Sequence, residues 1–142
     1  MTGLEIIEAL AAGDIPRPPL AELLDMSIDD VAPGRVTFGL DVDERLYNPL
    51  GSVHGGVLST LLDSAMGCAV HTTLPEELTF TTVELHVNFV RAVRAGAGRI
   101  RAEGEVISSG RRVATASGRI VGPDGALYAH GSTTCLVLPA AP

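Results

Sequence analysis

The feature that most constrains the fold is a long apolar helix pattern near the middle of the chain. Between residues 57 and 70, apolar side chains recur in two rows spaced by four positions: Val57, Leu61, Ala65 and Ala69, then Leu58, Leu62, Met66 and Val70. This spacing predicts a helix with a broad apolar face, and the other side keeps a narrow stripe of Ser59, Thr60, Asp63 and Gly67. One such helix buries its apolar face best against a single sheet.

The segments after this helix alternate apolar and polar residues, which predicts strands. One more alternating segment follows Pro33, before the helix. Glycine-containing turns separate the later strands at short intervals, which favours an antiparallel meander. We therefore expect an α+β fold, an antiparallel sheet of about five to six strands wrapped around one long central helix. The strand patterns cover residues 35–40, 79–90, 99–108, 113–121 and 126–138.

The first 33 residues are predicted to form a short helical extension of this unit. A helix pattern ends at Gly13, a proline-rich elbow follows at residues 16–19, and a second helical piece covers residues 20–26. The total of 142 residues is typical of one domain, so residues 1–142 are interpreted as a single domain.

The charge distribution limits the partners that the chain could bind. The net charge is −7, with 14 acids and 3 arginines in residues 1–90, but 3 acids and 7 arginines in residues 91–142. The acidic whole argues against nucleic-acid binding, which requires a basic face. The arginines of the last third could still bind a small phosphorylated ligand, because guanidinium groups match phosphate geometry.

Cysteines and apolar runs indicate the compartment. Two cysteines make no disulfide framework, and Cys68, within the apolar helix, is interpreted as a small buried thiol. The acidic N-terminus has no basic start of a secretory signal, and no apolar run reaches the length of a membrane span. A cytoplasmic protein with no membrane partner is expected.

The start of the central helix is the candidate site. A helix N-terminus presents free backbone N–H groups and partial positive charge, and Gly55 and Gly56 would let a polarised carbonyl approach them. Asp63 follows His54 by nine positions, which is beyond hydrogen-bond reach on one helix. A symmetric dimer would bring the helix start of one chain to Asp63 of the other. Dimerisation through a sheet edge would also protect the edges of a small open sheet.

These residues carry a family resemblance. Residues 48–65 read N-P-x-G-x-V-H-G-G-x-L-x-T-L-x-D-x-A, which resembles the signature of hotdog-fold acyl-CoA thioesterases of the PaaI-like, phenylacetic-acid-degradation type. The segments T-T-V-E-L-H-V-N-F at 81–89, G-R-R-V-A at 110–114, D-G-A-L-Y-A at 124–129 and S-T-T-C-L-V at 132–137 are similar to later strands of that family. The resemblance covers roughly residues 20–138.

The resemblance implies roles for individual residues. The Gly55 N–H would bind the thioester carbonyl oxygen next to Gly56, and Asp63 would attack the thioester or activate the water that does. Asn48 and His54 would organise the carbonyl side of the site. A strand hydroxyl, Thr82 or its neighbour Thr81, would position water or carboxylate. The phosphates of coenzyme A would be met by arginines beside strand turns, for which Arg91, Arg94, Arg111 and Arg112 are candidates.

The implied activity is hydrolysis of an acyl-CoA to free acid and CoA, with active sites at the interface of a homodimer that assembles further to a homotetramer. No metal or cofactor is implied. Two other readings of the same fold stay open, an acyl-thioester hydratase or dehydratase and a non-catalytic acyl-CoA sensor. The acyl group, the choice between CoA and acyl carrier protein, and the role of Asp63 as nucleophile or general base also stay open.

Overall fold

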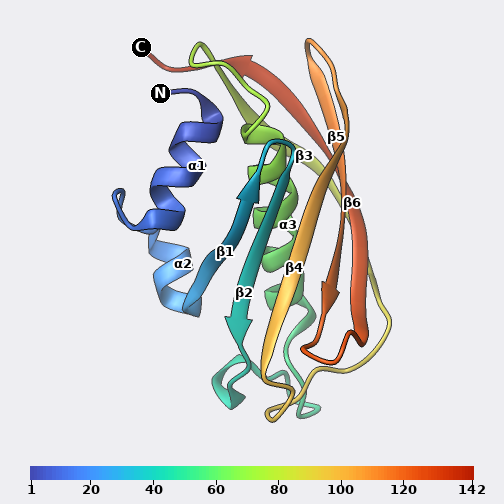
Figure 1. Ribbon diagram of the computed structural model, residues 1–142. Coiled ribbons are helices and arrows are strands. Elements are labelled where there is room, and N and C mark those ends of the chain that lie inside the picture. The colour runs from blue at the N-terminus through green and yellow to red at the C-terminus, as the bar shows by residue number, and fades with distance from the viewer.

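A six-stranded antiparallel sheet curls around one central helix, α3 (Gly55–His71), in the computed structural model, which describes residues 1–142 (Figure 1). The sheet order is β1-β2-β4-β5-β6-β3, so the two edges are β1 and β3. The α+β architecture expected from the sequence is confirmed. The strands are β1 (Met26–Ala32), β2 (Arg35–Asp41), β3 (Leu78–Phe89), β4 (Arg99–Ser109), β5 (Val113–Val121) and β6 (Leu127–Pro139), and a short 3-10 helix, η1, covers Glu44–Leu46.

Helix α3 lies close to the sheet because glycines face it. Gly104 of β4 and Gly118 of β5 are directly paired, and a Cβ on Gly104 would overlap the backbone carbonyl of Ala65. A Cβ on Gly118 would lie 3.0 Å from the Met66 side chain. The apolar face of α3 is therefore buried against strand backbone as well as side chains, and both rows of the sequence pattern contribute to the core, with Leu61, Leu62, Ala65, Met66, Ala69 and Val70 almost fully buried.

Two short helices and an edge strand form the N-terminal layer. Helix α1 (Gly3–Ala12) begins with a capping box between Thr2 and Glu5 and ends at Gly13, whose φ of 81° places it in the left-handed region. Helix α2 (Pro19–Leu24) follows the proline elbow. Residues 26–32, predicted to belong to the helical extension, instead form β1, which pairs with β2. The helical expectation was wrong there, because a bulge between Ile28 and Asp30 breaks the strand alternation.

The bulge in β1 has a structural partner. It frees Asp29 to form a two-pronged ion pair with Arg99 of β4, at 2.6 Å and 3.0 Å, across the intervening strand β2. The Arg99 guanidinium also donates to Ser27 at 2.7 Å. These contacts raise the pKa of Arg99 further above its already high value. The ion pair therefore holds the edge strand β1 to β4, across β2.

The opposite edge strand, β3, is twelve residues long and bonds to β6 on one side only. Several of its apolar side chains are unusually exposed: Val83 is 54% and Phe89 55% exposed, and Leu85 is exposed, as is Val90 directly after the strand. A long open edge with apolar side chains is a typical surface for pairing with another chain. No helix is both long and apolar enough to cross a membrane.

Candidate functional site

The N-terminus of α3 presents one free backbone donor. His54 is the N-cap, and its Nδ1 accepts a 2.8 Å hydrogen bond from the Gly56 N–H. The N–H groups of Val57 and Leu58 donate to the His54 carbonyl. Gly55 N–H donates to no group of the chain. It is therefore available to an external acceptor, at the positive end of a seventeen-residue helix.

The histidine is fixed in one tautomer by this cap. Because Nδ1 accepts a hydrogen bond from the Gly56 N–H, the neutral ring carries its proton on Nε2. The ring is exposed, so Nε2–H is a second donor beside the free N–H of Gly55. Both groups lie at the start of the helix, where the sequence analysis places the polarisation of a carbonyl.

Asn48 organises the loop that leads into the helix. Its Oδ1 accepts hydrogen bonds from the N–H groups of Leu50 (2.9 Å) and Ser52 (3.2 Å), and its Nδ2 donates to Ser52 Oγ at 3.2 Å. The carboxamide oxygen is therefore engaged within the loop. Asn48 lies near Gly55, but its visible contacts shape the backbone of residues 48–52.

A cavity of about 360 Å³ opens beside Gly55. Its walls come from the loop before α3, from the first turn of α3 and from the segment that follows β3, with Asn48, Gly55, Leu58, Phe89, Arg91 and Val93 among the lining residues. A Cβ on Gly55 would lie 3.0 Å from Cζ of Phe89, so the ring packs on the helix start. Glycine at this position keeps room for both the ring and a ligand.

Asp63 is held by the strand hydroxyl that the sequence predicts. Thr82 Oγ1 donates to Asp63 Oδ1 at 2.9 Å, from β3 to the third turn of α3. Thr81 points to the opposite face of the strand, where it pairs with Leu136 and is exposed. Asp63 forms no salt bridge within the chain, and its second oxygen receives no hydrogen bond from it. The carboxylate is oriented through one oxygen only.

Gly55 and Asp63 do not meet within one chain. They are eight residues apart on the same helix, which separates their backbones by about 12 Å at 1.5 Å per residue. A thioester carbonyl bonded to one N–H cannot also lie within reach of the carboxylate on the same helix. The two halves of the predicted site are thus both present but apart.

The four candidate arginines fall into two groups at opposite ends of the fold. Arg91 and Arg94 follow β3, and Arg91 lines the cavity beside Gly55. Arg111 and Arg112 lie in the turn between β4 and β5, at the same end of the fold as the C-terminus of α3 (Figure 1). All four are exposed, and none forms a salt bridge. One chain alone does not gather them around one phosphate group.

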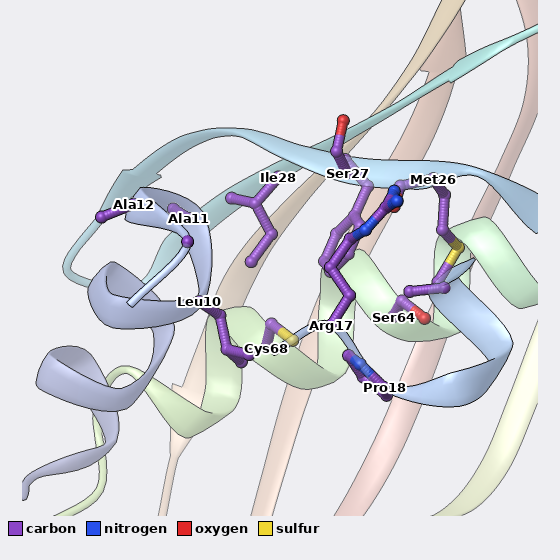
Figure 2. Close-up of a pocket in the computed structure, with 13 residues that line it drawn as sticks. Leu10, Ala11, Ala12, Arg17, Pro18, Met26, Ser27, Ile28, Ser64 and Cys68 are labelled. Carbon is purple, nitrogen blue, oxygen red and sulfur yellow. The ribbon is translucent and has the colours of Figure 1, made fainter. Parts of the chain in front are cut away.

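A second cavity, of about 370 Å³, lies on the other flank of α3 (Figure 2). We call this open pocket the N-terminal cavity. It lies between the end of α1, the proline elbow, α2, β1, β2 and α3, and its lining includes Leu10, Ala21, Met26, Ile28, Phe38 and Cys68. Burial, with a smaller contribution from the charge of Asp63, raises the pKa of the Cys68 thiol to about 12. The thiol is therefore un-ionised at neutral pH, although Cys68, predicted to be buried, is only partly buried.

Sequence patterns give no local signal for the N-terminal cavity or for Phe89. The cavity walls come from segments up to 58 positions apart, from Leu10 to Cys68. Phe89 is one of several apolar residues in an alternating strand, and only the three-dimensional contact with Gly55 distinguishes it. A glycine at position 55 is consistent with a close neighbour, but the sequence does not identify Phe89 as that neighbour.

Comparison with known proteins adds to this geometry. Residues 50–129 match the model of the thioesterase superfamily. The chain is 31% identical over 130 residues to a protein of Halobacterium salinarum whose name proposes that it is an esterase. The match covers 87% of this chain and 84% of that protein. It is 29% identical over 93 residues to the 1,4-dihydroxy-2-naphthoyl-CoA hydrolase of Listeria monocytogenes, covering 65% of this chain and 73% of the hydrolase.

Solved structures agree with the sequence matches. A phenylacetic acid degradation-related protein of Ralstonia eutropha superposes with a TM-score of 0.82 at 28% identity, over 92% of this chain and 98% of that one. Because 92% of the chain is matched, the structural similarity extends beyond residues 50–129.

Proposed function

This chain belongs to the thioesterase superfamily and is a PaaI-like hydrolase with the hotdog fold, and from that premise we propose that it cleaves acyl-CoA thioesters to a free acid and CoA. The observation that carries the proposal is the oriented carboxylate of Asp63, held by Thr82 at 2.9 Å with its second oxygen free of contacts in the chain. The CoA moiety is supported by the Listeria relative, whose name specifies a CoA thioester.

The carbonyl would be polarised at the start of α3. A thioester oxygen within hydrogen-bond distance of the Gly55 N–H gains negative charge as the tetrahedral intermediate forms, and a fixed N–H at a helix N-terminus stabilises that charge. The exposed ring of His54 would offer its Nε2–H at the same end of the helix. Neither group must move, because the N-cap already fixes both.

Asp63 would supply the attack on the carbonyl carbon. Either the free oxygen attacks, forming a mixed anhydride that water then hydrolyses, or it takes a proton from the water that attacks directly. In both routes the carbon–sulfur bond breaks, CoA leaves as the thiolate and is protonated, and the acyl carbon ends as a carboxylic acid. Thr82 keeps the carboxylate aimed in either case.

A dimer would complete the site. Pairing of β3 with β3 of a second copy would cover the exposed Val83, Leu85 and Phe89 and run the two α3 helices side by side in opposite directions. Gly55 of one protomer would then face Asp63 of its partner, which removes the separation of about 12 Å along one helix. Each dimer would hold two such sites.

The same pairing would bring the arginines together. Because the partner runs in the opposite direction, its β4–β5 turn would lie near the Gly55 end of the first protomer. Arg91 and Arg94 from one protomer and Arg111 and Arg112 from its partner would surround the mouth of one site. Four unpaired guanidinium groups suit the 3′-phosphate and pyrophosphate of CoA.

The test is thiol release from a panel of acyl-CoAs by the wild-type protein and by Asp63→Asn. We expect wild type to release one CoA per acid formed. The kcat of Asp63→Asn should be about 10²- to 10⁴-fold lower, since an amide can neither attack the thioester nor accept the proton. Unchanged mass and melting temperature would establish that the variant still folds and assembles. If wild type released no thiol from any acyl-CoA, the proposed function would be wrong; if Asp63→Asn kept most of the turnover, Asp63 would have no part in it.

A further inference from the structure

Two side chains of β3 face α3 although a regular strand could not present both of them to the helix. Thr82 donates to Asp63, and a Cβ on Gly55 would lie 3.0 Å from the ring of Phe89. Thr82 and Phe89 are seven positions apart, and side chains of a regular strand alternate between the two faces of the sheet. The strand must therefore contain an irregularity between these two residues.

The irregularity is a β-bulge at Val83. Thr82 pairs with Cys135 of β6. The neighbouring residue of β6, Thr134, pairs with Glu84, which leaves Val83 as the extra residue of β3. Because a shift of one residue moves every later side chain to the opposite face, the bulge lets both halves of β3 direct side chains to α3.

The bulged pairing competes with a regular one. Without the bulge, one half of β3 would slip by one residue along β6. A slip of the first half would turn Thr82 away from Asp63, and a slip of the second half would turn Phe89 away from Gly55. The bulge avoids both slips but disrupts the ladder of backbone hydrogen bonds where it occurs, so the backbone there needs another partner.

The hydroxyl of Thr133 supplies that partner. Thr133 lies opposite Leu85 on β6, and only 1% of it is exposed. Its Oγ1 donates a 2.8 Å hydrogen bond to the backbone carbonyl of Glu84, the residue directly after the bulge. A slip of β3 would move this carbonyl and leave a buried hydroxyl without its acceptor, which is costly. The hydrogen bond therefore favours the bulged register.

The orientation of Thr82 depends on the backbone at the bulge. Apart from Asp63, the polar group next to its hydroxyl is Cys135 Sγ, at 4.0 Å. A thiol is a weak hydrogen-bond partner and fixes a hydroxyl poorly. The direction of the Thr82 side chain must therefore come mainly from the conformation of the strand, whose irregular part begins at the next residue.

We propose that Thr133 is a positioning residue for the thioester hydrolysis, because its hydrogen bond to the Glu84 carbonyl maintains the bulge. The bulge in turn keeps Thr82 directed at Asp63. This inference rests on the proposed function. Thr133 makes no hydrogen bond to Asp63, so its effect on the rate passes through Thr82.

The experiment measures kcat and KM for one acyl-CoA in a double-mutant cycle of Thr133→Val and Thr82→Val. Valine has the shape of threonine but lacks the hydroxyl, and Thr133→Ser is the conservative variant that keeps it. Thr134→Val is the matched control on the same strand, because the Thr134 hydroxyl donates to the Glu84 carboxylate, at 3.4 Å, rather than to the backbone. Mass and melting temperature are measured for every variant.

We expect Thr133→Val to lower kcat about five- to tenfold, the effect of one lost hydrogen bond, with KM unchanged. Thr133→Ser should keep most of the wild-type kcat, and Thr134→Val should keep all of it. When Thr82→Val is already present, adding Thr133→Val should change kcat by less than about twofold, because no hydroxyl is left to position. A purely structural role would lower kcat equally in both backgrounds.

Equal losses in both backgrounds, or no loss in the wild-type background, would overturn the positioning role and leave the proposed function intact. If Thr133→Val does not fold, Thr133→Ala also lacks the hydroxyl and should give the same cycle. Failure of both variants to fold would assign the hydroxyl to the fold rather than to the reaction, and so would overturn the positioning role. Absence of any thiol release by the wild-type protein would overturn both proposals.

Discussion

The pairing of Asp63 with Thr82 is the contact on which the chemistry depends most. The sequence predicts these two residues together only through the family resemblance, because position 82 lies nineteen residues from Asp63 and on another element. The structure brings Thr82, and not Thr81, to the carboxylate, since neighbouring strand residues point to opposite faces. Asn48 shows the converse. The family resemblance implies a role for it in the site, but its hydrogen bonds to Leu50 and Ser52 follow from the loop conformation, which residue spacing does not predict.

Thr82→Val should lower kcat by about 10- to 100-fold, because a hydrogen bond to a charged group is worth roughly 1.5–3 kcal/mol. Without this bond the Asp63 carboxylate would no longer be held in one orientation. Thr82→Ser keeps the hydroxyl and should keep most of the activity. KM should change little in either variant, since Thr82 is placed to act on Asp63 rather than on CoA. Steady-state kinetics with one acyl-CoA measure both constants. Equal rates for the valine and serine variants would mean that the hydroxyl has no role in positioning.

At the scale of elements, α3 is predictable and β1 is not. The helix pattern over residues 57–70 lies within the observed Gly55–His71, because a one-sided apolar face is a direct consequence of helical geometry. In β1 the apolar residues Met26, Ile28 and Val31 are spaced by two and then by three, since the bulge shifts the register. A spacing of three is also typical of a helix, and the residue at the bulge, Asp29, forms an ion pair with Arg99 that only the structure shows.

The fit of α3 on the sheet leads to a stability prediction. Gly104→Ala should lower the free energy of unfolding by about 2 kcal/mol or more, because its Cβ would overlap the backbone carbonyl of Ala65 and force the helix away from β4. The matched control is Gly125→Ala, at a turn with φ of 84° and open space around the new Cβ, which tests backbone strain without a packing clash. Urea unfolding followed by circular dichroism measures both. A Gly104→Ala variant as stable as wild type would show that α3 is not held in direct contact with the strand backbone.

For the whole molecule, the need for a second chain follows from sequence and structure by the same reasoning. Nine positions between His54 and Asp63 already separate donor and carboxylate on one helix, and the open β3 edge with its exposed apolar side chains supplies a surface for a partner. The N-terminal cavity could not be anticipated in this way. It depends on how two short helices and a bulged strand pack on α3, and this packing is set by tertiary contacts rather than by local pattern.

The measurement that tests the central claim most directly is activity after mixing two inactive variants, Asp63→Asn and Gly55→Pro. Proline removes the Gly55 N–H, and His54 already has the extended backbone that a following proline requires, with φ of −58° and ψ of 134°. Gly55→Ala, which keeps the N–H while adding a Cβ against Phe89, is the control for crowding. Each parent must first show the mass and melting temperature of wild type.

A heterodimer of the two variants holds one intact site, made from Gly55 of one chain and Asp63 of the other, and one doubly damaged site. Random re-pairing of equal amounts makes about half of the dimers mixed, so we expect about a quarter of wild-type activity, against almost none for either parent. Verified heterodimers that are no more active than their parents would contradict a site shared between two chains.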